Sequence, residues 1–404
     1  MPRSLFLLPE EISPYSLSGR LGALAFFNGN DLSPTSPLKT LYCRLPERVL
    51  PQPRYCFLNA LNPFLCKDAI PEFNFYTKAQ ELFLKSDLTV LWSMRPLKTF
   101  EPMQLRLCKE ESFFKDEMRL LDLCTLLRAL KLFEMPKLNL SANLLKTAEL
   151  LGFKGELSRH QLSSRLEALV FLTQRAYDIS PKLFAFMHRS LGDVKKSLTQ
   201  ALAAKKPQVL VNRSGALNLI MPLELKGLYL RYVKLQGQEC VIETLDLKDG
   251  PLIAPAAVLT AERQHRLDFN LDKALENLAL GCNAISDLFE EKFTSLEESF
   301  RAKLNCYDKK LYHTLSETHF DVAPIPQASA FFKNWLLLCR GDNFRATLID
   351  TELERYRHLT AKALEQQIEA FSREVSSLVQ LMDENSAEDA ALADLIAKYP
   401  HFLN

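Results

Sequence analysis

The most informative segment of the chain is residues 337–348, which read Leu337-Leu338-Cys339-Arg340-Gly341-Asp342-Asn343-Phe344-Arg345-Ala346-Thr347-Leu348. A second distinctive segment, Leu50-Pro51-Gln52-Pro53, lies near the amino end of the chain. Neither segment is a glycine loop, and none of the 12 glycines falls in a G-x-G-x-x-G or G-x-x-x-x-G-K pattern. A nucleotide site built on such a loop is therefore not expected.

Outward from these segments, the first of three regions runs to about Ile179 and mixes strands with helices. Its short apolar runs predict buried strands at Leu5–Leu8, Leu21–Phe27, Leu38–Leu45 and Leu88–Trp92. Three leucine stripes at helical spacing follow, starting at Leu120, at Leu144 with Ser141 as its N-cap, and at Leu162. Strands followed by helices predict an α/β sheet with covered faces.

The second region opens at Pro181, and the third region is helical. Alternating residues predict strands of a small antiparallel barrel at Val209–Val211, Leu217–Met221, Tyr229–Leu235 and Cys240–Leu247. From Arg266 onward the pattern is helical. The apolar stripe within Asp350–Met382 is interpreted as a packing face rather than a ligand site.

The composition is that of a globular protein with no obvious polyanion partner. A chain of 404 residues predicts two or three domains, and Lys+Arg 50 against Asp+Glu 49 leaves a net charge of +1. The nine cysteines form no C-x-x-C pair, which predicts buried free thiols rather than a zinc site. Because the first apolar run is short and is followed by Pro9-Glu10-Glu11, we expect a cytoplasmic monomer without a leader or membrane segment.

Several segments, taken in order, resemble those of the bacterial exonuclease I family, whose members digest single-stranded DNA from the 3′ end. They are Leu50-Pro51-Gln52-Pro53, Leu120-Leu121-Asp122-Leu123, Pro181-Lys182-Leu183-Phe184, Phe269-Asn270 and Arg340–Leu348. The resemblance implies an RNase H-like exonuclease domain of the DEDD type over residues 1–180. It implies an SH3-like β-barrel domain with a helical extension over 181–292 and a helical domain over 293–404.

The resemblance also implies a catalytic site in which four carboxylates hold two Mg²⁺ ions and a histidine acts as general base. Most of these positions carry other residues here. The first aspartate is replaced by Pro9, and Glu11 remains. The next aspartate position falls near Thr99, with Glu101 two residues away, and the last falls on Ser164 or Arg165.

Three of the four ligand positions are thus lost or displaced, so we expect a catalytically degenerate protein. The surviving catalytic candidates are Glu11 and His160, and the metal candidates, if the chain is active, are Glu11 and Glu101. An arginine at residue 165 would place positive charge where the family seats a cation. A rescued arrangement would have to add Glu10 and Glu167.

Strand binding is the function that we expect to remain. Grooves for single strands combine Lys and Arg with stacking aromatic rings. The candidates are Lys195, Lys196, Lys205, Lys206, Arg213, Arg340 and Arg345, with Phe344 and Tyr232 as stacking residues. Alternatively, the lysines are solvated surface residues and Phe344 belongs to the core.

Two further function classes stay open, an active Mg²⁺-dependent 3′→5′ exodeoxyribonuclease with rearranged ligands and a protein-interaction scaffold without DNA binding. The leading interpretation is a protein of DNA-repair type that binds single-stranded DNA or a replication or repair partner. The family docks the tail of the single-stranded-DNA-binding protein partly through an arginine that follows a leucine. The matching segment is Leu259-Thr260-Ala261-Glu262, which lacks that arginine and puts recruitment by the tail in doubt.

Overall fold

A mixed sheet forms the centre of the first region in the computed structural model, which describes residues 2–13, 16–236, 239–285, 294–318, 320, 327–383 and 386–402. The strands are β1 (Arg3–Ser13), β2 (Arg20–Asn30), β3 (Ser33–Pro34), β4 (Lys39–Tyr42), β5 (Leu88–Leu91) and β6 (Leu120–Asp122). Their order is β3-β2-β1-β5-β6, with β4 also paired to β2. β1 is antiparallel to β2 and parallel to β5, and β5 is parallel to β6.

Both faces of this sheet are covered by helices, as the apolar runs predicted. Side chains of β1 alternate between two cores, since Leu5 and Leu7 belong to one and Phe6 and Leu8 to the other. The first core is closed by α2 (Glu72–Leu84) and α3 (Phe100–Arg106), and the second by α4 (Leu123–Phe133), α5 (Leu144–Leu150) and α6 (Leu162–Ile179).

Two local predictions in this region are wrong. The stripe that starts at Leu120 is not helical from its first residue, because residues 120–122 pair with β5 as strand β6 and the helix begins at Leu123. Asp122 makes the transition, since its Oδ1 accepts a hydrogen bond from the Thr125 amide at 2.8 Å. The N-cap of α5 is Asn143, whose side chain accepts from the Lys146 amide, and not Ser141.

The second region is built on a five-stranded antiparallel sheet in the order β10-β9-β8-β7-β11. The strands are β7 (Gln208–Val211), β8 (Leu217–Lys226), β9 (Tyr229–Gln236), β10 (Glu239–Asp246) and β11 (Leu252–Pro255). Four strands match the predicted runs, and β11 was not predicted. Its helices are α7 (Pro181–Met187), α8 (Leu191–Ala203), α9 (Ala261–Leu267) and α10 (Leu271–Ile285).

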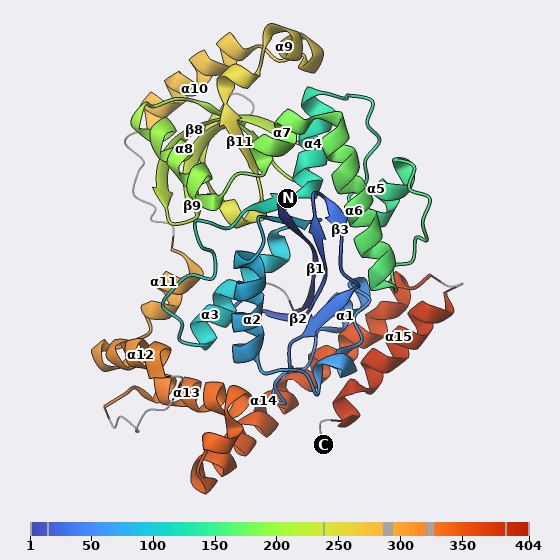
Figure 1. The fold of residues 1–404 in the computed structure, drawn as a ribbon. Coiled ribbons are helices and arrows are strands. Elements are labelled where there is room, and N and C mark those ends of the chain that lie inside the picture. Colours follow the sequence, from blue (N-terminus) through green and yellow to red (C-terminus); the bar gives the residue numbers. More distant parts are fainter. Residues whose placement is uncertain are drawn as a thin grey trace.

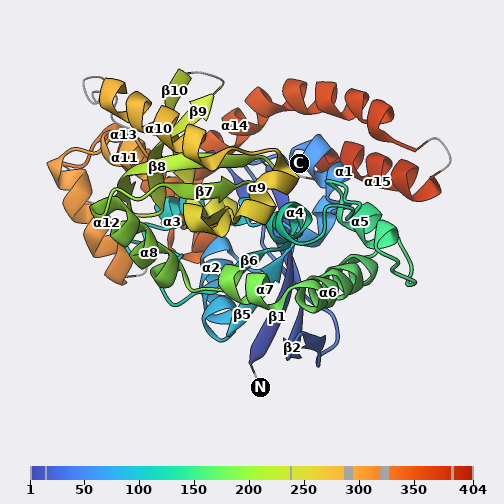
Figure 2. The same ribbon diagram turned by 90° about the horizontal axis from the view of Figure 1, so that it is seen from above.

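The carboxyl-terminal helices wrap around the first region (Figure 1). They are α11 (Leu296–Arg301), α12 (Cys306–Thr318), α13 (Ala330–Asn343), α14 (Asp350–Ser377) and α15 (Ala387–Lys398). The chain passes from the side of the second sheet to the opposite end, where α15 lies beside α1 (Pro53–Leu58) in both views (Figure 2). Residues of α14, α15 and α1 share one core there. The predicted boundary at residues 292–293 lies outside the described residues.

The state of the cysteines and the character of the helices bear on two predictions made for the chain as a whole. Of the eight cysteines whose side chains the structure describes, six are buried, Cys240 is half-buried and Cys306 is exposed, and all eight are free. Within the described residues, no helix has the length and apolar character needed to cross a bilayer.

Candidate functional site

A pocket of about 470 Å³ opens where the first region meets the β7–β8 loop of the second region. Its lining includes four arginines from separate segments, and we call it the arginine pocket: Arg95, Arg159, Arg165 and Arg213. The rest of its wall is Leu8, Pro9, Glu11, Tyr55, Leu58, Asn59, Trp92, Ser93, Pro96, Ala142, Asn143, Leu144 and Leu145. The carboxyl ends of parallel strands gather at one edge of a sheet, which is where ligands of open α/β sheets bind.

The ends of β1 and β5 position the first part of the pocket. The pairing of β1 with β2 is irregular between Glu10 and Ser13, a distortion that often accompanies functional sites. After β5 the chain turns into a 3₁₀ helix, η2 (Arg95–Thr99). The turn is fixed by Asp122, whose Oδ2 accepts a hydrogen bond from the Met94 amide at 2.9 Å.

Two of the four arginines are held in place by carboxylates. Arg165, on α6, donates from Nη2 to Glu10 Oε1 at 2.7 Å and from Nη1 to the Asn59 carbonyl at 3.0 Å. Arg159 donates from Nη2 to Asp389 Oδ1 at 2.6 Å, and its guanidinium lies 4.5 Å from the centroid of the Phe57 ring. Both side chains are therefore fixed before any ligand arrives.

The other two arginines stand closer to solvent. Arg95 is exposed and lies near enough to Glu11 to interact with its charge. Arg213, in the β7–β8 loop, is half-buried, and its charge lies near the Cys124 thiol and the Asp122 carboxyl group. Burial raises the pKa of Glu11 from 4.5 to about 7, against the opposing charge of Arg95 and with added repulsion from Glu10. Near neutral pH the wall of the pocket thus holds four guanidinium groups, two of them paired with Glu10 and Asp389, and one carboxyl group that is only partly ionised.

The structure brings Pro9, Glu11 and Arg165 together in this pocket and leaves the other predicted catalytic positions outside its wall. Thr99 and Ser164 are buried, and Glu167 is exposed. Thr99 Oγ1 donates to the Pro96 carbonyl at 2.6 Å. His160 Nε2 lies 2.6 Å from Asp389 Oδ1 and contacts Arg159, so the predicted base is engaged with the carboxyl-terminal region.

The donor set of the arginine pocket does not fit a pair of divalent cations. Mg²⁺ requires several oxygen ligands, usually including carboxylates. Glu11 is the one carboxylate in the wall, and Glu10 behind it is paired with Arg165. Among the residues that the structure describes, no group of three or more His, Cys, Asp or Glu side chains could hold a metal ion. Guanidinium groups instead favour an anion.

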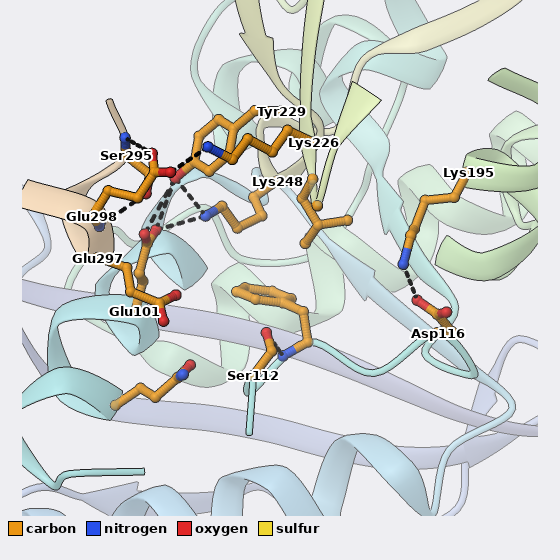
Figure 3. Close-up of a pocket in the computed structure, with 14 residues that line it drawn as sticks. Glu101, Ser112, Asp116, Lys195, Lys226, Tyr229, Lys248, Ser295, Glu297 and Glu298 are labelled. Atoms are coloured by element: carbon orange, nitrogen blue, oxygen red, sulfur yellow. Dashed lines mark hydrogen bonds and ion pairs between the residues drawn. The ribbon is translucent and has the colours of Figure 1, made fainter. Parts of the chain in front are cut away.

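Glu101, the second metal candidate, lies in a different pocket of about 400 Å³ that is lined by all three regions (Figure 3). Its Oε2 accepts from Lys248 Nζ at 2.6 Å and from the Tyr229 hydroxyl at 3.1 Å. Lys195, a predicted DNA-binding residue, pairs with Asp116 at 2.7 Å in the same pocket. The cations drawn in Figure 3 are therefore paired with carboxylates of the protein.

The segment at 340–345 makes contacts within the chain. Arg340 pairs with Glu352 at 2.9 Å, Arg345 pairs with Glu47, and Phe344 packs edge-on against Phe73 with ring centroids 5.2 Å apart. Asp342 accepts from Arg48 Nη2 at 2.8 Å and from the Tyr356 hydroxyl at 3.0 Å. Asn343 Oδ1 accepts from the Phe73 amide at 2.8 Å. The segment thus joins the third region to the first.

The remaining predicted strand-binding residues are dispersed. Lys196, Lys205 and Lys206 are exposed on or just after α8, and Tyr232 is buried with its hydroxyl 2.8 Å from Glu243 Oε2. Of the six leading DNA-binding candidates, only Arg213 lies in the arginine pocket. DNA contact by Lys195, Lys196, Arg213, Arg340, Phe344 and Arg345 stays a prediction.

Sequence reasoning did not single out Arg95, Tyr55 or Trp92, which also line the pocket. A signal for two of them was present. Trp92 and Arg95 follow the buried run of β5, and residues at the carboxyl end of such a strand are good candidates for a site. Tyr55 lies two residues after the Leu-Pro-Gln-Pro segment, from which it is separated by Arg54.

Comparisons with known proteins give a match in structure and none in sequence. No protein-family model matches the chain, and no curated protein matches it. A structure described as suggesting how exonuclease I achieves processivity is 17% identical, with a TM-score of 0.78 over 100% of this chain and 99% of that chain. E. coli exonuclease I in complex with a dA16 oligonucleotide is also 17% identical, with a TM-score of 0.76 over 100% of both chains.

A crystal structure of SSB/exonuclease I with the inhibitor CFAM is 16% identical and has a TM-score of 0.79 over 100% of both chains. These matches span all three regions, and the predicted fold class of an α/β exonuclease-like domain followed by a β-domain and a helical domain is confirmed. The chain therefore has the exonuclease I fold from end to end, as the resemblance of its short segments predicted.

Proposed function

We propose that this protein binds single-stranded DNA in the manner of an exonuclease I-like protein and does not hydrolyse it. The observation that carries the proposal is the arginine pocket, which stands at the edge of the sheet with four guanidinium groups and one carboxylate. A phosphodiester is an anion with oxygens that match the N–H donors of arginine.

The fold supports the binding half of the proposal. Exonuclease I of the same fold has been solved with a dA16 oligonucleotide and in other single-stranded-DNA complexes. A net charge of +1 does not oppose strand binding, because a local cluster of cations is sufficient to attract a polyanion.

The side-chain inventory supports the absence of hydrolysis. Two-metal hydrolysis needs carboxylates that hold one ion on the attacking oxygen and one on the leaving oxygen. Glu11 alone cannot hold two ions, and Glu101 is bonded to Lys248 in the other pocket. An active exodeoxyribonuclease with rearranged Mg²⁺ ligands would require Glu10 to release Arg165 and the surrounding arginines to move away.

A binding titration at several salt concentrations tests the proposal. A 5′-fluorescein dT₂₀ strand is titrated with the full chain in Mg²⁺ buffer, and the strand length is checked afterwards on a gel. We expect binding that weakens steeply with salt, because Lys and Arg release counterions from the phosphates, and a strand of unchanged length.

The opposite results each overturn one half of the proposal. No binding at low salt would favour the alternative of a protein-interaction scaffold. Shortening of the strand in Mg²⁺ would favour the active enzyme. Recruitment through the SSB tail forms no part of the proposal, because the segment Leu259-Thr260-Ala261-Glu262 lacks the arginine that the resemblance leads us to expect.

A further inference from the structure

We propose that the arginine pocket is a metal-independent site for the phosphate of a single nucleotide, taken either as a free nucleoside monophosphate or as the terminal nucleotide of a strand. This inference deepens the proposed function, and its strand arm rests on that function. The free-nucleotide arm does not, so the two can fail separately.

The guanidinium groups of the pocket take the place of a metal ion as the positive charges that bind the phosphate. In a two-metal site the ions bridge acidic side chains to the phosphate oxygens. Here the guanidinium groups of Arg95, Arg159, Arg165 and Arg213 line the wall themselves, so the phosphate needs no bridging ion. Arginine offers a planar fork of N–H donors that matches two phosphate oxygens at once.

Part of the pocket is organised in advance for an anion. Arg165 is fixed by Glu10 and the Asn59 carbonyl, and Arg159 by Asp389 and the Phe57 ring. A guanidinium has five N–H groups, so these contacts leave donors for a ligand. Side chains that are already ordered lose little entropy when the ligand binds.

The uncharged half of the wall fits the rest of a nucleotide. Tyr55 and Trp92 supply aromatic rings, while Leu58, Pro96 and Leu144 supply apolar surface. Trp92 is held in place, because its Nε1 donates to the Ala142 carbonyl at 3.2 Å. Bases stack on such rings without regard to sequence.

The size of the pocket indicates one nucleotide unit rather than a length of strand. Its volume of about 470 Å³ falls within the roughly 300–1,000 Å³ of small-ligand sites. Walls come from β1, α1, the β5–η2 turn, residues 142–145, α6 and the β7–β8 loop.

Calorimetric titration of thymidine 5′-monophosphate in EDTA tests the free-nucleotide arm. We expect saturable binding to the wild-type chain and binding of thymidine that is weaker by at least about 10-fold, since charged hydrogen bonds to the phosphate are lost. R95A and R213A should each weaken the binding of the monophosphate by about 10- to 100-fold. These two side chains are exposed or half-buried, so unchanged melting temperatures will confirm that both variants fold.

R175A is the matched control. Arg175 is an exposed arginine on α6, about 15 Å along the helix from Arg165 by helical rise, and it does not line the pocket. Its titration should equal that of the wild type. The pocket assignment is overturned if the monophosphate fails to bind in EDTA, if it binds only after Mg²⁺ is added, or if R95A and R213A bind as the control does.

The strand arm compares linear dT₂₀ with a circular single strand of similar composition in EDTA. A preference for the linear strand that R95A removes supports the end-binding form of the proposal. If both strands bind equally and R95A has no effect, the strand-end assignment fails while strand binding stands. If the monophosphate binds through the arginines and neither strand binds, the pocket stands and the proposed function fails.

Discussion

Glu11 is the carboxylate in the wall of the arginine pocket, and its surroundings move its pKa away from that of an exposed glutamate. The groups around it are Arg95 from η2, Arg165 and Arg159 from α6 and the segment before it, and Arg213 from the β7–β8 loop. Glu10 precedes it on β1. Burial outweighs the opposing charge of Arg95 and, with repulsion from Glu10, raises the pKa of Glu11 to about 7.

The first prediction follows from the direction of that shift. Below pH 4.5 Glu11 is protonated in both folded and unfolded chains, and between 4.5 and about 7 only the unfolded chain releases the proton readily. The stability of the wild type should therefore fall relative to Glu11→Gln as pH rises from 4.5 to about 7, and then level off. Urea unfolding of both proteins across this range measures the difference, and a difference that stays constant with pH contradicts the account.

The same residue has a consequence for ligand binding. Above pH 7 the phosphate of thymidine monophosphate stays fully charged while Glu11 becomes the carboxylate, so repulsion grows. We expect the affinity to fall between pH 7 and 8.5 in the wild type and to stay level in Glu11→Gln. Calorimetry at three pH values in this window measures the affinity of both proteins. The same dependence of affinity on pH in the two proteins would contradict the prediction.

Among the elements, α13 and α14 make an unusually close contact at Gly341. A Cβ built on Gly341 would lie 2.2 Å from ring carbons of Tyr356, whose hydroxyl bonds to Asp342. Since Gly341 is helical, alanine would otherwise be favoured there, and the close approach explains why the segment needs glycine.

Gly341→Ala is the second prediction about stability. Moving the Tyr356 ring should cost about 1–3 kcal/mol of unfolding free energy, because overpacking forces neighbouring side chains and backbone to shift. Gly192→Ala is the comparison, since Gly192 is also helical and its added Cβ would meet the Asp116 Cβ and carbonyl oxygen only at 3.2 Å, a clash much less severe than that at Gly341. Equal losses of unfolding free energy in the two variants would show that the Tyr356 ring is not what makes glycine necessary at residue 341.

Element by element, the sequence predicted the buried strands well and the boundaries less well. Runs such as Leu5–Leu8 are apolar on both faces because both faces of the sheet are covered, and that pattern is visible without a structure. The strand at 120–122 was missed because its leucines continue without a break into α4. β11 is only four residues long and ends at Pro255, which weakens its strand signal.

The site was predictable only in part, for a physical reason. The prediction that carboxylates are lost rests on Pro9 and on Ser164 or Arg165, which stand in segments that resemble those of the family. That Arg95, Arg159 and Arg213 meet around Glu11 could not, because they come from three separate segments and their approach depends on tertiary packing. A cation from an unrelated loop has no local sequence signal.

Across the whole molecule, buried ion pairs join the carboxyl-terminal helices to the first region. Asp342 at the end of α13 pairs with Arg48, and the Asp342 carbonyl accepts from Arg44 at 2.8 Å. Behind them Glu72 binds Arg20 and Arg106; burial alone would raise the pKa of Glu72, but these arginines lower it to about 2. The segment at residues 337–348 thus joins the carboxyl-terminal helices to the first region.

Arg48→Ala tests whether the ion pair between Arg48 and Asp342 holds the two regions together. Asp342 would lose its closest cation in a buried setting, which should cost about 1–3 kcal/mol and raise amide hydrogen exchange in α13 and the start of α14. Arg54→Ala, at an exposed arginine of α1, is the control and should leave exchange in these helices unchanged. Protection in α13 that survives Arg48→Ala would show that the ion pair does not hold the regions together.

Digestion of a 5′-labelled single strand with Mg²⁺ and with Mn²⁺, with cleavage and strand retention followed in the same tube, tests the central claim most directly. We expect the strand to stay bound at full length in both metals and in EDTA, and Arg95→Ala to weaken its retention. Metal-dependent shortening from the 3′ end that Glu11→Ala abolishes would contradict it, because one carboxylate among four arginines would then be supporting the hydrolysis.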